Sequence, residues 1–291
     1  MKIPHLVALL VLNVCWAATM SANKALGAYL HPGGITTLRF GVAALCLLAL
    51  WPWLPGRAPR GRDFGMSVLI GLLVFVLGQR LQVWGNELGK AGDSAVLMAL
   101  EPLLTTVAAA LFLREHIGPR RVIGFGVGLV GVLLLNGAWR ADFHWTGVVP
   151  SLIFVSSFLC ETAYSILGKQ LLERAVVTKV VAVALLGATA VNLLIDGSKT
   201  LAAAQALPLR SWFLLVYLAL VCTVVGYSLW YVVIKEAPVN VVALTIFVQP
   251  VAGVAMAAAW LGEPLHWGQL WGSLAIAAGL AYGLSRQLKR E

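Results

Sequence analysis

The sequence predicts an all-α polytopic membrane protein, with ten transmembrane helices arranged as two inverted five-helix repeats around a central cavity. The first observation is composition: the chain has 291 residues, of which 60% are hydrophobic and 11% charged, against roughly 25% charged in ordinary soluble proteins. The second is that the apolar residues fall into ten runs of about the length that crosses a bilayer, roughly 20 residues each. These runs leave no room for a sizeable soluble domain, so a soluble enzyme is excluded.

The ten runs follow one another with short connections that contain Pro, Gly and charged residues. The second run ends at Pro55-Gly56-Arg57, and the fourth ends at Arg114-Glu115-His116. Consecutive apolar positions favour helices over outer-membrane barrel strands, which alternate in polarity, and Gly-rich stretches such as 122–135 indicate helices packed through small residues. The expected helices are residues 4–23, 34–54, 64–86, 92–113, 119–138, 146–168, 177–196, 211–234, 239–261 and 267–286.

The positive charge is distributed as in a multi-pass membrane protein. The net charge is +9, but Lys and Arg occur in ones to threes between apolar runs rather than on one solvated face, so no nucleic-acid partner is expected. With the N-terminus inside, most of the 21 Lys and Arg residues fall in cytoplasmic connections. We therefore expect a protein of the cell (inner) membrane, with both termini cytoplasmic and the lipid bilayer as its surroundings.

An internal repeat divides the chain into two halves, residues 1–140 and 141–291. Five helices per half is an odd number, so the two halves must cross the membrane in opposite directions. Inverted repeats of this kind underlie many alternating-access transporters. One constant offset pairs Pro102 with Pro250, Glu115 with Glu263, Gly124 with Gly272 and Gly131 with Gly279.

These paired residues, together with Arg39-Phe40 in the second run, resemble the drug/metabolite transporter superfamily, of the EamA type with two five-helix repeats. The resemblance covers nearly the whole chain. It implies ten helices around a central cavity and a small-molecule substrate exchanged by alternating access, since the family exports amino acids and other small metabolites. The small multidrug-resistance branch carries an essential acidic residue in its first helix, and the first run here has no carboxylate.

Ionisable groups inside the spans are the main functional candidates, because they are costly in a membrane. Glu101 lies near the midplane and directly precedes Pro102, which opens a helix locally because it lacks an N–H donor. Prolines at matching places, Pro102 and Pro250, indicate a central site. Glu101 can carry a coupling proton or hold a substrate ammonium; the alternative is a structural Glu paired permanently with Arg80. Its repeat partner is Gln249.

Three further charged residues lie within the spans. Glu161 has Tyr164 one turn away, and it is either a second coupling or binding group or the donor of an interhelical hydrogen bond. Arg80 can grip a substrate carboxylate through its planar fork, or extend to the outer interface. Arg39 matches a position typical of the family and is either structural or part of the binding site.

A polar wall and an aromatic wall are expected to line the cavity, which suits a ligand with polar and apolar parts. Glu115 and Glu263 are expected to stabilise the N-terminus of the helix that follows each of them. The remaining predicted lining residues are Asn13, Trp16, Gln79, Gln82, Tyr164, Tyr227, Trp230 and Gln249.

The sequence thus favours a secondary active transporter, an exporter of a small metabolite such as an amino acid, with protons as a candidate coupling ion. The alternative is efflux of cationic or uncharged organic compounds, with carboxylates and aromatic rings as cation sites.

A membrane-embedded enzyme or an ATP-driven pump is not expected, because the chain has neither HExxH nor GxxxxGK[ST]. No cofactor or metal is expected. A non-transporting scaffold would leave the midplane charge unexplained, and the sequence leaves monomer and homodimer open.

Overall fold

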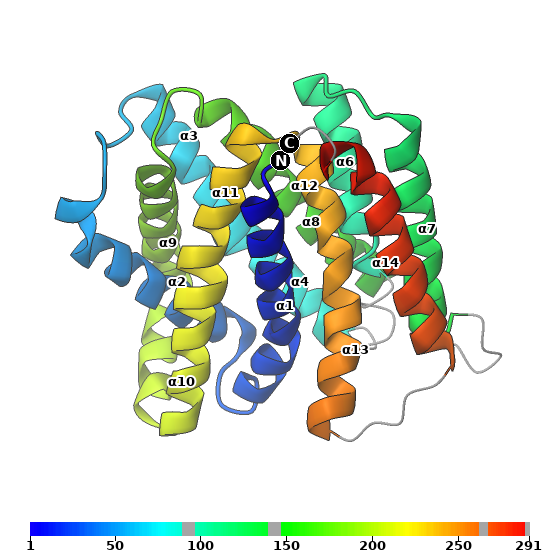
Figure 1. Ribbon diagram of the computed structural model, residues 1–291. Helices are drawn as coiled ribbons and strands as arrows, with labels where there is room; N and C mark the ends of the chain where they lie inside the picture. The colour runs from blue at the N-terminus through cyan, green and yellow to red at the C-terminus, as the bar shows by residue number, and fades with distance from the viewer. Residues whose placement is uncertain (89–96, 139–146, 262–266, 289–291) are drawn as a thin grey trace.

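The computed structural model describes residues 1–88, 97–138, 147–261 and 267–288, and within them it is helical without strands, as predicted. Figure 1 shows the helices side by side, with the start of α1 and the end of α14 at the same end of the molecule. The helices are α1 (Ile3–Leu26), α2 (Pro32–Ala49), α3 (Arg62–Gly71), α4 (Gln79–Leu88), α6 (Leu100–Leu113), α7 (Pro119–Leu135), α8 (Val148–Leu171), α9 (Val177–Gln205), α10 (Leu209–Tyr217), α11 (Gly226–Glu236), α12 (Val239–Ala243), α13 (Val248–Leu261) and α14 (Trp267–Leu288).

Several of these helices join end to end into longer rods. The described residues contain seven helices long and apolar enough to cross a membrane, among them the composite rods Arg62–Gly85 and Leu209–Glu236, together with the shorter apolar helix α6. The protein is therefore a multi-pass membrane protein, and the count of ten spans stays a prediction. Helix α9 runs past its predicted end at residue 196 to Gln205, because Asp196 and Lys199 interrupt the hydropathy of this segment without interrupting its helix.

Two wide helical turns occupy corresponding places in the two halves. A π-helical segment, η2 (Leu72–Gly78), joins α3 to α4, and a second, η3 (Leu218–Val225), joins α10 to α11. In each, a backbone carbonyl accepts a side-chain hydrogen bond: Phe75 from Asn192 at 3.0 Å, and Cys222 from the Trp16 indole at 2.8 Å. Such π segments occur frequently at functional sites, and here each leads into a pocket-lining segment.

The two repeat-related prolines also lie beside interruptions of their helices. Pro102 lies in the first turn of α6, after a turn at residues 98–99. Pro250 follows the short 3₁₀ helix η4 (Leu244–Phe247), which separates α12 from α13. A proline clashes with the carbonyl four residues earlier, and both interruptions include that position. Both prolines border the same small apolar gap, between α6 and η4.

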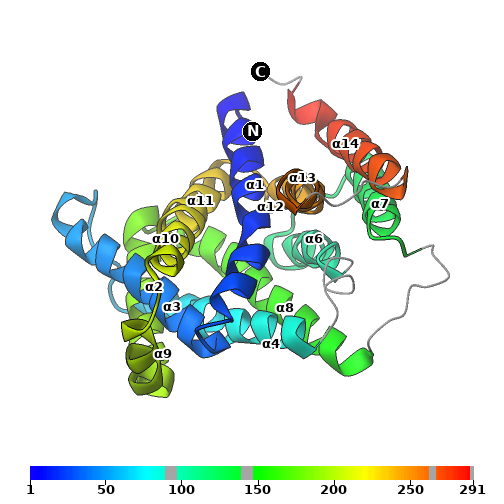
Figure 2. The ribbon, with the colours of Figure 1, turned by 90° about the horizontal axis from the view of Figure 1, so that it is seen from below.

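Helices α7 and α14 form a pair at one edge of the molecule, as Figure 2 shows from below. They touch through the glycines that the repeat matches. A Cβ on Gly124 would lie 2.8 Å from the carbonyl oxygen of Gly279, and one on Gly131 would lie 2.8 Å from that of Gly272. The backbones therefore approach too closely for any other residue, which is how small residues pack membrane helices.

The largest buried cluster lies away from this pair, between α2, η2, α8, α9 and α11. Phe40 and Phe75 pack with centroids 4.8 Å apart, and Tyr164 stacks on Tyr231 at 4.0 Å. All four rings are buried, and Tyr164 also lines the pocket described next.

Candidate functional site

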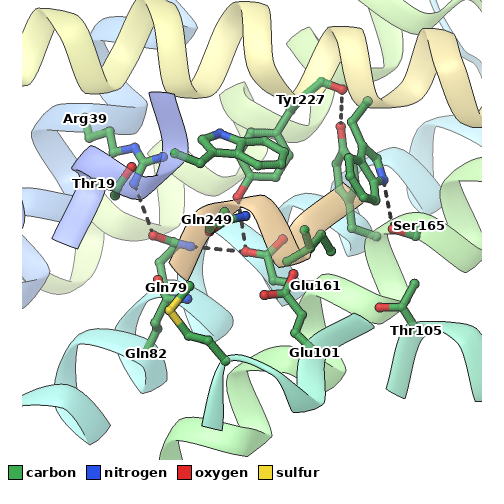
Figure 3. A pocket seen from close by; sticks show the side chains of 15 residues that line it. Thr19, Arg39, Gln79, Gln82, Glu101, Thr105, Glu161, Ser165, Tyr227 and Gln249 are labelled. Carbon is green, nitrogen blue, oxygen red and sulfur yellow. Dashed lines mark hydrogen bonds between the residues drawn. The ribbon is translucent and has the colours of Figure 1, made fainter. Parts of the chain in front are cut away.

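A pocket lies in the middle of the helix bundle, with an empty volume of about 730 Å³, its open mouth included. Helices from both halves of the chain contribute to it, and Figure 3 shows their side chains converging. Its lining residues are Trp16, Thr19, Arg39, Gln79, Gln82, Met98, Glu101, Thr105, Glu161, Tyr164, Ser165, Tyr227, Trp230, Ile246 and Gln249.

Two carboxyl groups enter the pocket from α6 and α8, but their surroundings differ. Glu161 accepts a hydrogen bond from the Gln79 amide at 3.1 Å and another from the Tyr227 hydroxyl at 3.1 Å. No side chain in the described ranges donates to Glu101, which faces Glu161 in Figure 3 without a dashed line. Glu161 is therefore held by two donors, whereas Glu101 has no side-chain donor among the described residues.

A guanidinium lies in the same pocket, on the α2 side. Arg39 is 4% exposed and donates from Nε to the Thr223 hydroxyl at 2.9 Å and from Nη1 to the Gln79 amide oxygen at 3.3 Å. Thr223 in turn donates to the Leu218 carbonyl within η3 at 2.8 Å. Thr223 in the π-helical segment thus orients Arg39, and the Gln79 amide lies between Arg39 and Glu161, accepting from one and donating to the other.

Aromatic rings cover the side of the pocket near α1 and α11. Trp16 lies 5.8 Å from both Tyr227 and Trp230, measured between ring centroids. The polar edge of Trp230 is occupied, because its indole donates to the Ser165 hydroxyl at 3.0 Å. These rings therefore offer apolar surface to a ligand while their own polar atoms stay bonded within the protein.

Gln249, the repeat counterpart of Glu101, also lines the pocket, and Asn13 lies behind it. The Gln249 amide donates to the side-chain oxygen Oδ1 of Asn13 at 2.9 Å, and the Asn13 amide donates to the Thr245 hydroxyl at 3.1 Å. Asn13 is fully buried and outside the lining set. It positions Gln249 and has no contact with the pocket of its own.

Arg80 lies outside the pocket, toward α9. Its guanidinium forms an ion pair with Asp196 and donates to the Asn192 amide oxygen at 2.9 Å from Nη2. Both charged groups press against Gly33 in the first turn of α2, where a Cβ would lie 2.7 Å from Arg80 Nη1. The permanent partner of Arg80 is therefore Asp196 and not Glu101.

Sequence reasoning left out some residues that the fold brings to these places. Thr19, Met98, Thr105 and Ile246 line the pocket, but hydroxyl and apolar side chains are common inside spans and give no distinct signal. Asp196 was placed at the end of a run rather than inside a helix. The sequence does contain an indication of this place: Asp196 follows Asn192 by four residues, so the two side chains lie on the same face of a helix.

The fold and the pocket together are those of a membrane protein that handles a small molecule between its helices. The chain belongs to the EamA-like transporter family, whose model matches residues 3–137 and again residues 149–283.

Individual relatives agree with this membership. A protein of Streptantibioticus cattleyicolor, named a probable terminal-alkyne amino-acid exporter, is 27% identical and covers 95% of this chain and 93% of its own. A protein of Salmonella typhimurium, named a probable amino-acid metabolite efflux pump, is 28% identical over 65% of this chain and 66% of its own. A crystal structure matches with a TM-score of 0.77 and 19% identity, covering 97% of this chain and 99% of that chain; at this identity the likeness shows the fold.

Proposed function

We propose that this protein is a secondary active transporter that exports a small zwitterionic metabolite, such as an amino acid, by alternating access. One observation carries the proposal: the carboxyl of Glu101, to which no side chain of the described ranges donates, and the guanidinium of Arg39 line the same pocket, beside aromatic rings. A zwitterion has the complementary charges, and relatives named as amino-acid exporters support the choice of substrate class.

Each charged group has a distinct role in this proposal. Glu101 binds the substrate ammonium or, in its absence, a coupling proton, because no side chain in the described part of the protein donates to its oxygens. Arg39 binds the substrate carboxylate through the N–H groups that Thr223 and Gln79 leave free. Glu161 acts through Gln79 and Tyr227 by holding the polar wall in position. Arg80 has a structural role through its ion pair with Asp196 and does not bind the substrate.

In this proposal, the two inverted halves move relative to each other and expose the pocket alternately to the two sides of the membrane. Three repeat-related features support this arrangement: the crossed glycine contacts between α7 and α14, the two π-helical segments and the two prolines that border one gap. We place both termini on the cytoplasmic side, from the distribution of Lys and Arg in the connections.

Transport by the purified protein in liposomes tests the proposal. Uptake of a panel of radiolabelled amino acids is measured with and without a pH gradient, for the parent protein and for Glu101→Gln. We expect the parent to respond to the gradient, with substrate affinity rising with pH until Glu101 is fully ionised, and Glu101→Gln to lose this dependence. Glu173→Gln, an exposed carboxylate outside the pocket, is the matched control. Unchanged rate and pH dependence in Glu101→Gln would remove Glu101 from the mechanism.

A second candidate is efflux of cationic organic compounds, because the pocket holds two carboxyl groups and one guanidinium beside several aromatic faces. Expressing cells are grown on a toxic amino-acid analogue and, separately, on a cationic dye. Resistance to the analogue favours the first candidate. Resistance to the dye alone favours the second.

A further inference from the structure

The repeated glutamate Glu115 occupies a place that neither the pocket nor the expected helix cap explains. It follows the C-terminus of α6, but it caps α12 instead of the next helix, α7. Its Oε1 accepts from the backbone N–H of Val239 at 2.8 Å, and its Oε2 accepts from the N–H of Asn240 at 3.0 Å and from the Asn240 side chain at 2.6 Å. Its repeat counterpart, Glu263, lies outside the described residues.

A partly buried lysine completes the cluster. Lys169 on α8 donates to Glu115 Oε1 at 3.1 Å and to the Ala237 carbonyl at 2.8 Å, in the connection between α11 and α12. The side chain of Glu115 is 10% exposed and that of Lys169 is 24% exposed. Arg121 on α7 also donates to the Asn240 side chain. One carboxylate therefore ties together the ends of α6 and α8 and the start of α12, through charge-assisted bonds in a largely dry setting.

These three helices also line the pocket. Glu101 and Thr105 belong to α6, Ser165 to α8, and Ile246 to the segment that continues α12. Lys169 lies a single helical turn beyond Ser165, a rise of about 6 Å. The cluster therefore joins the pocket-lining helices just beyond the pocket, at the end where α12 begins and where Figure 1 shows the chain terminus of α1.

We propose that Glu115, Lys169 and Asn240 form a latch that closes the pocket toward the side of the chain termini. The inference rests on the proposed transport function, because alternating access requires that this side open during each cycle. A substrate passing between the pocket and this side must part α12 from α6 and α8, and these are the helices that the carboxylate joins. Opening therefore requires Glu115 to release the α12 amides.

The accessibility of the pocket to a thiol reagent tests the latch without any substrate. In a background with the four native cysteines replaced by alanine, the single variant Met98→Cys places a thiol in the pocket lining. Sealed vesicles of both orientations, identified by a tag on the N-terminus, are labelled with a membrane-impermeant maleimide. Glu115→Gln and Lys169→Met are compared with Glu173→Gln, the exposed carboxylate four residues after Lys169.

We expect both latch variants to raise labelling from the terminus side about fivefold or more, since losing bonds of this strength shifts a two-state equilibrium by such a factor. Glu173→Gln should label as the parent does. If Glu115→Gln fails to fold, Lys169→Met decides alone. Parent-like labelling in both latch variants, or an equal rise in Glu173→Gln, would overturn the latch. Failure of amino-acid transport would count against the proposed substrate and leave the labelling result standing.

Discussion

Arg39 and Arg80 are both arginines inside membrane-spanning helices, yet the fold gives them opposite settings. Arg80 is neutralised by a direct ion pair with Asp196, and its remaining bonds go to Asn192. Arg39 is bonded to neutral groups, Thr223 and Gln79, and meets a carboxylate only through the Gln79 amide. A fully paired arginine has little left to offer a ligand, whereas Arg39 keeps part of its charge and donors available in the pocket.

The largest expected effect is on the stability of the protein when the Arg80 pair is broken. Arg80→Met leaves Asp196 without its partner between helices. Removing one member of a buried pair costs about 3–5 kcal/mol, and the lower end, about 3 kcal/mol, is expected here because the two side chains are 24% and 16% exposed. Thermal unfolding in detergent should show the loss, while substrate affinity of the folded protein changes little. Replacing both members, Arg80→Met with Asp196→Leu, should recover most of the stability. If instead Arg80→Met abolishes substrate binding in protein that is still folded, Arg80 belongs to the site.

Removing Arg39 should have the converse effect. Arg39→Gln takes away a charge-assisted contact worth about 1.5–3 kcal/mol, which corresponds to roughly 10–100-fold weaker binding of the proposed amino-acid substrate. Equilibrium binding to purified protein measures it. Arg39→Lys keeps the charge but loses the two-pronged geometry, so it should recover only part of the affinity. Parent-like affinity in Arg39→Gln would show that the carboxylate binds elsewhere.

Gln79 and Asn192 each accept a hydrogen bond from one of the two arginines, so their substitutions can be compared directly. Gln79→Leu breaks two hydrogen bonds, one to Arg39 and one to Glu161. At about 1 kcal/mol for each bond, it should weaken substrate binding roughly thirtyfold. Asn192→Leu breaks the corresponding bonds of Arg80 and should lower the unfolding midpoint while leaving affinity near that of the parent. Measuring both quantities on both variants checks the distinction. It fails if the two variants behave alike.

The smallest effect is expected from the hydroxyl that orients Arg39. Thr223→Val removes the acceptor for Arg39 Nε and costs about 1 kcal/mol, a loss of roughly fivefold in affinity. Thr223→Ser retains the hydroxyl and is the control, with binding expected near the parent value. A loss in Thr223→Ser as large as that in Thr223→Val would attribute the effect to packing in η3.

Much of the architecture follows from the chain itself. Runs of apolar residues predict the helices because every backbone polar group must be satisfied within the bilayer, and most predicted ends agree with the helices to within a few residues. The main difference is α9, which continues through charged residues. The breaks near Pro102 and Pro250 lie beside the prolines, and local opening was expected at Pro102. Hydropathy measures how apolar a segment is, and it does not detect where a helix continues with polar side chains.

The candidate site was predicted less completely, and the two arginines show why. The depth of a charged residue along its helix can be estimated from the sequence, and this singles out Arg39, Arg80, Glu101 and Glu161. The rotation of each helix about its axis and the identity of its neighbours cannot be estimated in this way. Arg39 meets Thr223 and Arg80 meets Asn192 only after distant segments pack together.

The sequence alone determined that this is a membrane protein, which of its segments are helical, which few charged residues lie inside them and which residues repeat. The tertiary structure decided which of those charges face a common pocket, which cancel one another and where the repeated glutamate binds. The physical reason is the distance along the chain over which each interaction acts. Burial in a bilayer and helix formation act on local composition, whereas the pairing of charges depends on contacts between helices far apart along the chain.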